Sequence, residues 1–219
     1  MAAGERQGDA GHFPPVAVLT DWPTAADGEG FLLSPVMAGL PVGQASALAL
    51  GPARNANQRL FDVLAGRPAG HPRACAGLFA VDPFVGLKEI RLRLERAGIA
   101  TVANWPSVGL FDPPFLKELS GKGLGFEREV AFVEAMAGAG FRTLATVFTL
   151  DQGLAMQDAG ADGILLHPPL VAGRIMTLAD ALDWAGPTIE ELQAAGLPVS
   201  LYLEEPAAKL RPGLTIFGG

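Results

Sequence analysis

A shortened eight-stranded (β/α)8 barrel, the TIM-barrel architecture, is the fold class that this sequence predicts from two observations. The first is a dipeptide, Ala-Gly, that ends a helical segment directly before an apolar run at Gly98, Gly140, Gly160 and Gly196. A glycine in this place takes the left-handed conformation that ends a helix. An apolar run directly after it is typical of a strand buried on both faces. Repeated units of this kind predict parallel strands joined by helices.

The second observation is the composition, which supports one domain with a large buried core. Of the 219 residues, 49% are hydrophobic and 18% are charged, and 28 glycines and 18 prolines suit tight turns between buried strands. The net charge of −7, without a Lys/Arg cluster, argues against nucleic acid and membrane partners. The single cysteine, Cys75, excludes an intrachain disulfide, and the absence of a long apolar span or signal pattern favours a cytoplasmic location.

The elements follow from apolar runs of strand length and from apolar residues at helical spacing. Strands are predicted at residues 16–20, 31–34, 77–81, 101–104, 143–148, 163–166, 199–203 and 214–217, and helices at 54–65, 85–96 and 126–138. Asp151 is expected to cap a short helix that runs to Asp158. Thr177 opens another helix, and the residues from Thr188 to Glu191 form a capping box for its continuation.

The ends of the barrel are predicted to be reduced, because few helical segments accompany the first and last strands. An open doubly wound sheet remains the alternative, since periodicity does not establish closure. Residues 1–14 are expected to be a flexible N-terminal segment, and residues 15–219 a single domain. Without a last helix, the apolar surface of the first and eighth strands would be uncovered, so we expect a homo-oligomer that buries it.

Three polar residues follow strands at the end where parallel barrels carry their chemistry. Asp82 either binds a metal or acts as a base, or caps the next helix. Asn104 either binds a carboxylate or enolate oxygen through its amide, or closes a turn. His167 either shuttles a proton or donates to an oxyanion, or has a structural role. The barrel interpretation predicts that all three side chains face one pocket.

Weaker signals surround this expected pocket. Glu204, the first of two glutamates after the seventh strand, is a candidate metal ligand, although both glutamates also suit a solvated loop. Gly218 and Gly219 follow the eighth strand and offer backbone N–H groups to a phosphate. Residues 105–125 hold three prolines and four glycines and predict either a lid or a loop with one helical turn at 115–119. P-loop, GxGxxG, HExxH and GxSxG motifs are absent.

Several segments carry a family resemblance. They are AGLPVG (38–43), VDPF (81–84), NWPSVGLFD (104–112), GLGFEREV (123–130), TVF (146–148) and AGADGILLHPPL (159–170). In these segments the chain resembles the phosphoenolpyruvate hydrolase-like family of TIM barrels, also described as IGPS-like. That family is similar to the phosphoenolpyruvate/pyruvate barrel superfamily, whose members act on small 2-oxo acids and their phosphorylated relatives, often with Mg²⁺.

The resemblance implies roles for residues in the matching segments. It implies that Asp82 holds Mg²⁺, that Asn104 and His167 stabilise an enolate, and that Ser107 binds substrate. The sequence then supports two hypotheses. One is an enzyme of the hydrolase or lyase type that acts on a small phosphorylated or 2-oxo carboxylate. The other is a catalytically inactive barrel that serves as a ligand-sensing or protein-interaction module.

Overall fold

The sheet of this protein is built from seven parallel strands and one antiparallel strand. The computed structural model describes residues 17–23, 30–41, 43–67, 73–169, 177–203 and 213–217. The strands are β1 (Ala17–Leu19), β2 (Phe31–Leu33), β3 (Ala74–Leu78), β4 (Thr101–Asn104), β5 (Arg142–Val147), β6 (Gly163–Leu166), β7 (Val199–Leu203) and β8 (Gly213–Phe217). Each strand from β1 to β7 pairs in parallel with the next. This confirms the parallel pairing that the Ala-Gly repeats predict.

The eighth strand departs from the predicted architecture. β8 lies between β7 and β1 and runs antiparallel to both. It pairs with β7 over its whole length but meets β1 at one residue pair, Ala17 with Gly213. The fold is therefore a shortened TIM-like barrel on a curled sheet of seven parallel strands. This agrees with the predicted shortened (β/α)8 barrel except in β8, which is antiparallel. The side chains of β8 lie outside the described residues, so the homo-oligomer stays a prediction.

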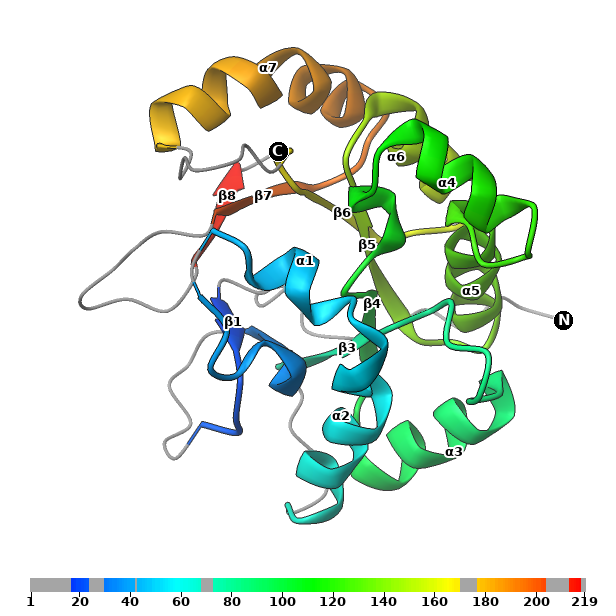
Figure 1. The fold of residues 1–219 in the computed structure, drawn as a ribbon. Coiled ribbons are helices and arrows are strands. Elements are labelled where there is room, and N and C mark those ends of the chain that lie inside the picture. Colours follow the sequence, from blue (N-terminus) through cyan, green and yellow to red (C-terminus); the bar gives the residue numbers. More distant parts are fainter. Residues whose placement is uncertain are drawn as a thin grey trace, which may run out of the picture.

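The helices lie mostly on the outside of the curled sheet (Figure 1). They are α1 (Ala45–Ala49), α2 (Ala56–Ala65), α3 (Leu87–Ala97), α4 (Pro113–Ser120), α5 (Phe126–Gly138), α6 (Leu150–Asp158) and α7 (Leu178–Ala194), with 3-10 turns η2 (Pro35–Met37), η3 (Pro52–Arg54) and η4 (Val108–Leu110). Helix α1 is the exception, because it lies across one end of the sheet (Figure 1). In the part of the chain that the structure describes, no helix is long and apolar enough to cross a membrane.

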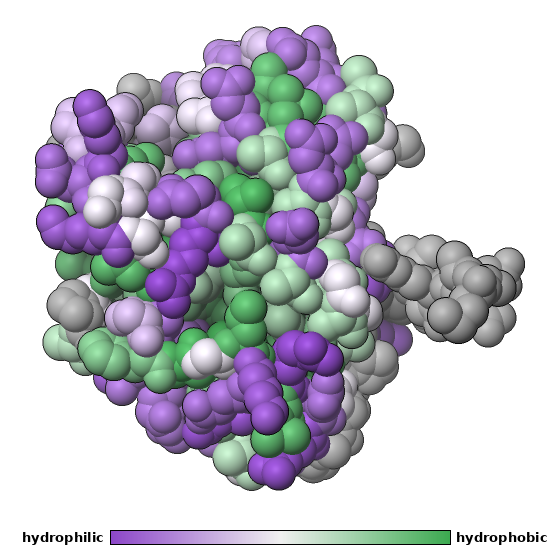
Figure 2. Space-filling model, turned by 90° about the vertical axis from the view of Figure 1, so that its right-hand side faces the viewer, coloured by the Kyte–Doolittle hydropathy of each residue, from purple (hydrophilic) through white to green (hydrophobic). Residues whose placement is uncertain are grey.

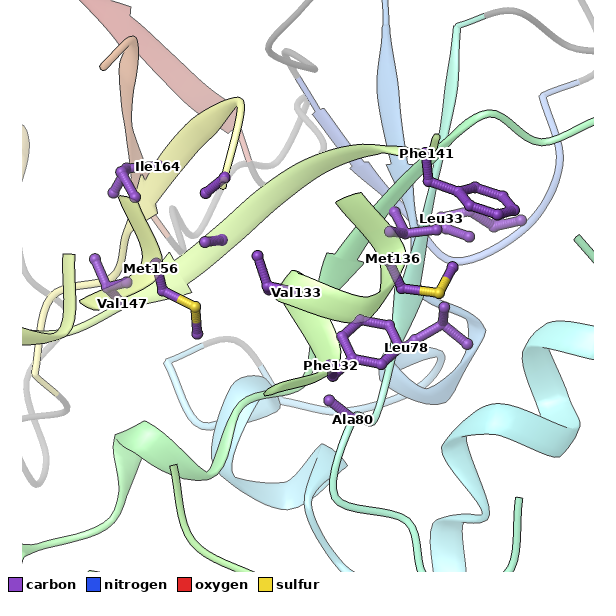
Figure 3. Packing of buried hydrophobic residues seen from close by; sticks show 14 of the residues in the cluster. Leu33, Leu78, Ala80, Phe132, Val133, Met136, Phe141, Val147, Met156 and Ile164 are labelled. Carbon is purple, nitrogen blue, oxygen red and sulfur yellow. The ribbon is translucent and has the colours of Figure 1, made fainter. Parts of the chain in front are cut away.

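The strands bury both of their faces in two separate apolar clusters. One cluster fills the space between the sheet and the outer helices, and Figure 3 shows Phe132, Val133 and Met136 of α5 in it, near Leu78 of β3. The second cluster fills the inside of the barrel, and its strand residues alternate with those of the first. They are Val18, Leu32, Cys75, Ala103, Leu144, Leu165 and Tyr202. This alternation tells which side chains face the lumen and which face the helices.

The four Ala-Gly glycines adopt the conformation that the sequence predicts. Their φ angles are +66° at Gly98, +92° at Gly140, +85° at Gly160 and +89° at Gly196. Each follows a helix and precedes a buried strand, so each sets the direction in which the chain returns to the sheet. A residue with a Cβ is strained at these angles, because the Cβ crowds the neighbouring carbonyl oxygen.

Gly138, the last residue of α5, and Gly140, which follows its C-cap, allow a test of this conformational effect. Replacing Gly140 with alanine is expected to lower the free energy of unfolding by about 1–2 kcal/mol. The matched control, Gly138→Ala, is expected to raise it by about 0.5 kcal/mol, because Gly138 is helical. A Cβ at either site meets nothing within 4 Å, so packing does not contribute. Urea unfolding of both variants measures the difference, and equal effects would contradict the interpretation.

Three local predictions differ from the structure by more than a residue or two at the end of an element. The third strand is Ala74–Leu78 and not 77–81, because Cys75 to Leu78 pair with the whole of β4. Asp151 is not the cap of α6, since Thr149 accepts the hydrogen bond from Gln152 N–H. Residues 105–125 contain the two-turn helix α4 as well as η4, and not one turn at 115–119.

Helix α7 begins as predicted but does not restart where a second cap was expected. Thr177 and Asp180 form a reciprocal capping box at its start. The helix then continues through Pro187 and Thr188 to Ala194. Its buried stripe explains the continuity, because the stripe keeps helical spacing past the expected break, through Ala181, Ala185, Ile189 and Leu192.

Candidate ligand site at the mouth of the barrel

The end of the barrel at which the parallel strands finish is lined by aromatic side chains and one histidine. Trp105 and His167 directly follow β4 and β6, and Phe148 directly follows β5. Alternate side chains of a strand point to the same face, and Leu165 and Ala103 point into the lumen. His167 and Trp105 each come two residues later, so both also point into the lumen. We call this end of the barrel the mouth.

His167 is buried among three rings and has a defined tautomer. Its ring lies 5.6 Å from that of Trp105, 5.1 Å from that of Phe148 and 4.8 Å from that of Tyr202, between centroids. Its Nδ1 is 2.6 Å from the carbonyl oxygen of Pro168, and its Nε2 is 2.9 Å from Oγ of Ser46. A carbonyl oxygen only accepts hydrogen bonds, so Nδ1 carries a proton. In the neutral ring Nε2 is then the unprotonated nitrogen, and it accepts from the Ser46 hydroxyl.

The segment after β2 covers the mouth. Trp105, which is 1% exposed, donates from Nε1 to Ser34 Oγ at 3.1 Å and lies 3.3 Å from Met37 Sδ. Ser46 reaches His167 from α1. The indole of Trp105 packs closely on Gly77, where a Cβ would lie 3.2 Å from its Cδ1. Trp105 is thus a packing residue. We call residues 34–41 and 43–49 the cover of the mouth.

Below the mouth, the lumen holds hydroxyl groups that have no hydrogen-bond partner among the described residues. They belong to Thr146 on β5 and Ser200 on β7, and both residues are fully buried. Each is paired across the sheet with Leu165, so the two lie in one cross-strand row. Their alternation with Leu144 and Tyr202 places them on the lumen side. A buried hydroxyl without a partner costs about 1–3 kcal/mol, so these groups favour a polar occupant of the lumen.

Asn104 and Ser107 face away from the lumen, toward α5. Asn104 comes two residues after Val102 and so points to the same face of the strand, and Val102 lies in the outer cluster. Its Nδ2 donates to Glu129 Oε2 at 2.6 Å and to the carbonyl oxygen of Thr146 at 3.1 Å, and its Oδ1 accepts from Thr146 N–H at 2.6 Å. Ser107 Oγ donates to the same Glu129 oxygen at 2.6 Å. Both residues therefore join the chain after β4 to α5 and β5, behind the mouth.

Glu129 is the centre of this network. It is fully buried, and its second carboxylate oxygen, Oε1, accepts from Val108 N–H at 2.7 Å. Burial raises the pKa of Glu129 to about 7, although the hydrogen bonds from Ser107, Asn104 and Val108 oppose that rise. The sequence reasoning did not select Glu129. The signal was present, because Glu129 lies three residues after Phe126 and four before Val133, on the apolar stripe of α5.

Asp82 lies in the loop after β3 and is not a helix cap. The N-cap of α3 is Gly86, which makes no side-chain hydrogen bond. The Asp82 carboxylate accepts from Phe84 N–H at 2.9 Å and from Asn57 Nδ2 at 3.0 Å. Asn57 also binds both backbone groups of Phe79. Asp82 therefore ties the β3 loop to the start of α2.

Among the described residues, Asp82 does not belong to a cluster of metal ligands. Groups of three or more His, Cys, Asp or Glu side chains that could hold a metal are absent from this part of the chain. Both oxygens of Asp82 accept hydrogen bonds from protein groups. Glu204, Gly218 and Gly219 lie outside the described residues. Of Asp82, Asn104 and His167, only His167 faces the lumen, so the structure does not bring the three together in one pocket.

Comparison with known proteins relates the chain to one family. The family model described as phosphoenolpyruvate hydrolase-like matches residues 40–196, which include every residue discussed around the mouth except Ser34, Met37 and the β7 residues. The uncharacterized protein y4oT of Sinorhizobium fredii is 30% identical over 156 residues, which cover 69% of this chain and 79% of y4oT.

Two larger proteins match a shorter part of the chain. The ToMV resistance protein Tm-1(GCR237) of Solanum lycopersicum is 39% identical over 92 residues, which cover 42% of this chain and 12% of that protein. The putative transcriptional regulatory protein y4pA of Sinorhizobium fredii is 32% identical over 91 residues, or 15% of its length. The matched segment therefore makes up a small part of each of these two relatives.

Proposed function

Because the chain belongs to the phosphoenolpyruvate hydrolase-like family, we propose that it binds a small phosphorylated or 2-oxo carboxylate at the mouth of its barrel. His167 is the residue that contacts the ligand. The observation that carries the proposal is the inward-facing imidazole, whose Nε2 lies 2.9 Å from the hydroxyl of Ser46 in the cover of the mouth. A ligand oxygen that displaces this hydroxyl meets a nitrogen of fixed orientation.

The tautomer of His167 suits proton transfer at Nε2. The Pro168 carbonyl holds a proton on Nδ1, so the neutral ring accepts a proton at Nε2 and the charged ring donates one there. In the hydrolysis of an enol phosphate, water adds to phosphorus and the bond to the enol oxygen breaks. The charged ring gives its Nε2 proton to that oxygen, and a proton of the attacking water returns to the ring, so that the enol and phosphate leave. This step places the reaction in the hydrolase or lyase class.

The lumen and the network behind the mouth complete the proposed site. The hydroxyls of Thr146 and Ser200 supply hydrogen-bond donors for a carboxylate below His167. Asn104 and Ser107 act as positioning residues, since their bonds to Glu129 hold the chain that carries Trp105. Entry of a ligand requires that the cover of the mouth moves, because Ser46, Met37 and Ser34 contact His167 or Trp105.

A ligand-sensing module is the second candidate function. It is favoured by y4pA, a putative transcriptional regulatory protein in which the similar segment is 15% of the chain. In that case the same ligand would bind at His167 and move the cover, without turnover. The two functions share a binding site and differ in chemistry, so one set of variants distinguishes them.

Calorimetry with oxalate, pyruvate and phosphoenolpyruvate, with and without Mg²⁺, tests the proposal. Oxalate imitates an enolate and is expected to bind the wild type. His167→Asn keeps a group near Nδ1 but removes the Nε2 position, and we expect it to weaken binding at least about tenfold. His167→Gln places an amide near the Nε2 position and is expected to bind oxalate without turnover. Asp82→Asn serves as the control on the rim and tests the predicted metal role.

Each result has a defined meaning. Release of phosphate or pyruvate by the wild type, lost in both His167 variants, supports an enzyme. Binding without turnover supports the sensing module. No heat with any of the three compounds, in a protein whose unfolding transition is intact, contradicts both. A loss of Mg²⁺-dependent binding in Asp82→Asn would assign the metal role that the described residues do not show.

A further inference from the structure

A pocket lies between α2 and α3. Both helices are on the outside of the barrel (Figure 1). Its volume is 390 Å³, which is within the range of small-molecule sites. It is lined by residues near the C-terminal ends of both helices, and these ends lie opposite the mouth because the helices run antiparallel to the strands. The pocket is therefore separate from the site proposed at His167.

The floor of this pocket is apolar and its rim is cationic. Phe61 and Leu64 of α2, both buried, form the floor. Arg93 and Arg96 of α3 and Arg67 after α2 supply three guanidinium groups, and no carboxylate is among the lining residues. Such a concentration of arginine is unusual in a chain with 16 basic and 23 acidic residues. The pocket thus combines an apolar surface with positive charge.

One of the three guanidinium groups is held in place before any ligand binds. Arg93 lies over the ring of Phe61, with its Cζ 4.6 Å from the ring centroid, and pairs with Glu89 at 2.7 Å. These two contacts fix the side chain against the apolar floor. A ligand that uses this group therefore loses less side-chain entropy on binding.

The charges of the rim leave a net positive balance. Arg67 pairs with Asp21 at 3.1 Å, but the two side chains are 39% and 71% exposed, so the pair is weak and open to exchange. Arg96 is exposed and has no ion pair among the residues that the structure describes. The helix dipole favours a basic residue in the last turn of α3, and this accounts for the presence of Arg96 but not of the other two arginines. It does not explain why Arg67 and Arg93 line the same apolar pocket.

We propose that this pocket binds a small amphipathic anion, in which a carboxylate or phosphate head is joined to an apolar ring or chain. The guanidinium groups pair with the head, since their planar donor arrangement matches the oxygens of carboxylates and phosphates. The apolar part lies between the helices against Leu64, Ala65 and Ala97 and is removed from water there, because Arg93 covers the ring of Phe61. A compact dianion such as oxalate lacks the apolar part and is not a ligand of this site.

The test uses phenyl phosphate and phenylacetate as probes in a titration followed by amide NMR shifts of the full chain. Both probes are expected to shift the amides of Phe61, Leu64 and Arg96. Inorganic phosphate lacks the apolar group, and benzyl alcohol lacks the anionic group. Each is therefore expected to bind at least about tenfold more weakly than the probes. His167→Asn is expected to leave the affinity for both probes unchanged, which separates this site from the mouth.

A matched pair of charge reversals on α3 distinguishes the pocket from general electrostatics. Arg96→Glu and Arg91→Glu change the net charge equally, but Arg91 does not line the pocket and lies near Glu95. Arg96→Glu is expected to weaken phenyl phosphate binding about tenfold, and Arg91→Glu less than about twofold. Equal weakening by both variants, equal affinity for phosphate and phenyl phosphate, shifts confined to the mouth, or no binding would each overturn the proposal.

Discussion

Replacing Glu129 with alanine is expected to lower the free energy of unfolding by about 3–5 kcal/mol, the range for removing one partner of a buried charged network. The variant leaves the side-chain donors of Asn104 and Ser107 and the N–H of Val108 without their acceptor in a buried region. Each such orphaned donor is costly. The removed side chain also leaves a cavity between α5 and the chain after β4.

Urea unfolding, followed by the fluorescence of buried Trp105, measures this loss. Glu134→Ala is the matched control, because Glu134 lies on the same helix and is exposed, and its effect is expected to stay within about 0.5 kcal/mol. Glu129→Gln is expected to fall between the two, since one of its terminal atoms is a donor that faces other donors. A loss below about 1 kcal/mol in Glu129→Ala would show that the network contributes little.

Glu129 also shows what the sequence could and could not predict about the site. The helix that carries it was predicted at its observed bounds, 126–138, and helical spacing placed Glu129 on the buried stripe. Candidate site residues were sought at the ends of strands, which selected Asn104. Glu129 was not selected because it lies within a helix. The partner of that carboxylate, Ser107, was selected through family resemblance, and its contact with Glu129 depends on the path of residues 105–110 between β4 and α5.

The direction of strand side chains was the main property that could not be predicted. A parallel strand in this fold is apolar on both faces, so its sequence carries no alternation that marks the lumen. In the strand at residues 101–104 (TVAN), the sequence did not show which set of alternating side chains faces the lumen. The structure places Ala103 and Trp105 inward and Asn104 outward. His167 fell on the lumen side, and its surroundings depend on Ser46, which is 121 residues away in sequence.

Local signals predicted the connections well, and nonlocal pairing was the limit. Each Ala-Gly glycine takes the predicted positive φ. This angle was predictable because the end of a helix and its turn depend only on residues that are neighbours in sequence. The orientation of β8 depends on which strands lie beside it. An apolar run such as LTIF pairs in either direction, and here it runs antiparallel to β7. The barrel class was therefore predictable, and the form of its closure was not.

The stability of the wild type is expected to fall as the pH rises from about 5 to 8, by up to about 3 kcal/mol from Glu129. Burial raises the pKa of Glu129 from 4.5 to about 7 in the folded chain. Between these values the folded state holds a proton that the unfolded state has released. Unfolding then releases a proton, so a rise in pH favours the unfolded state. Below pH 4.5 the contribution is complete, and above about pH 7 it has been lost.

Glu129→Gln isolates this contribution, because glutamine does not ionise and all other groups are shared. The difference in unfolding free energy between the wild type and Glu129→Gln is expected to decline with pH across this window and then to become constant. A carboxyl NMR titration of Glu129 gives its folded pKa directly. A difference that instead rises between pH 3 and 5 would mean that the hydrogen bonds from Asn104, Ser107 and Val108 outweigh burial. The carboxylate would then anchor the chain behind the mouth as an anion at every pH at which a ligand reaches His167.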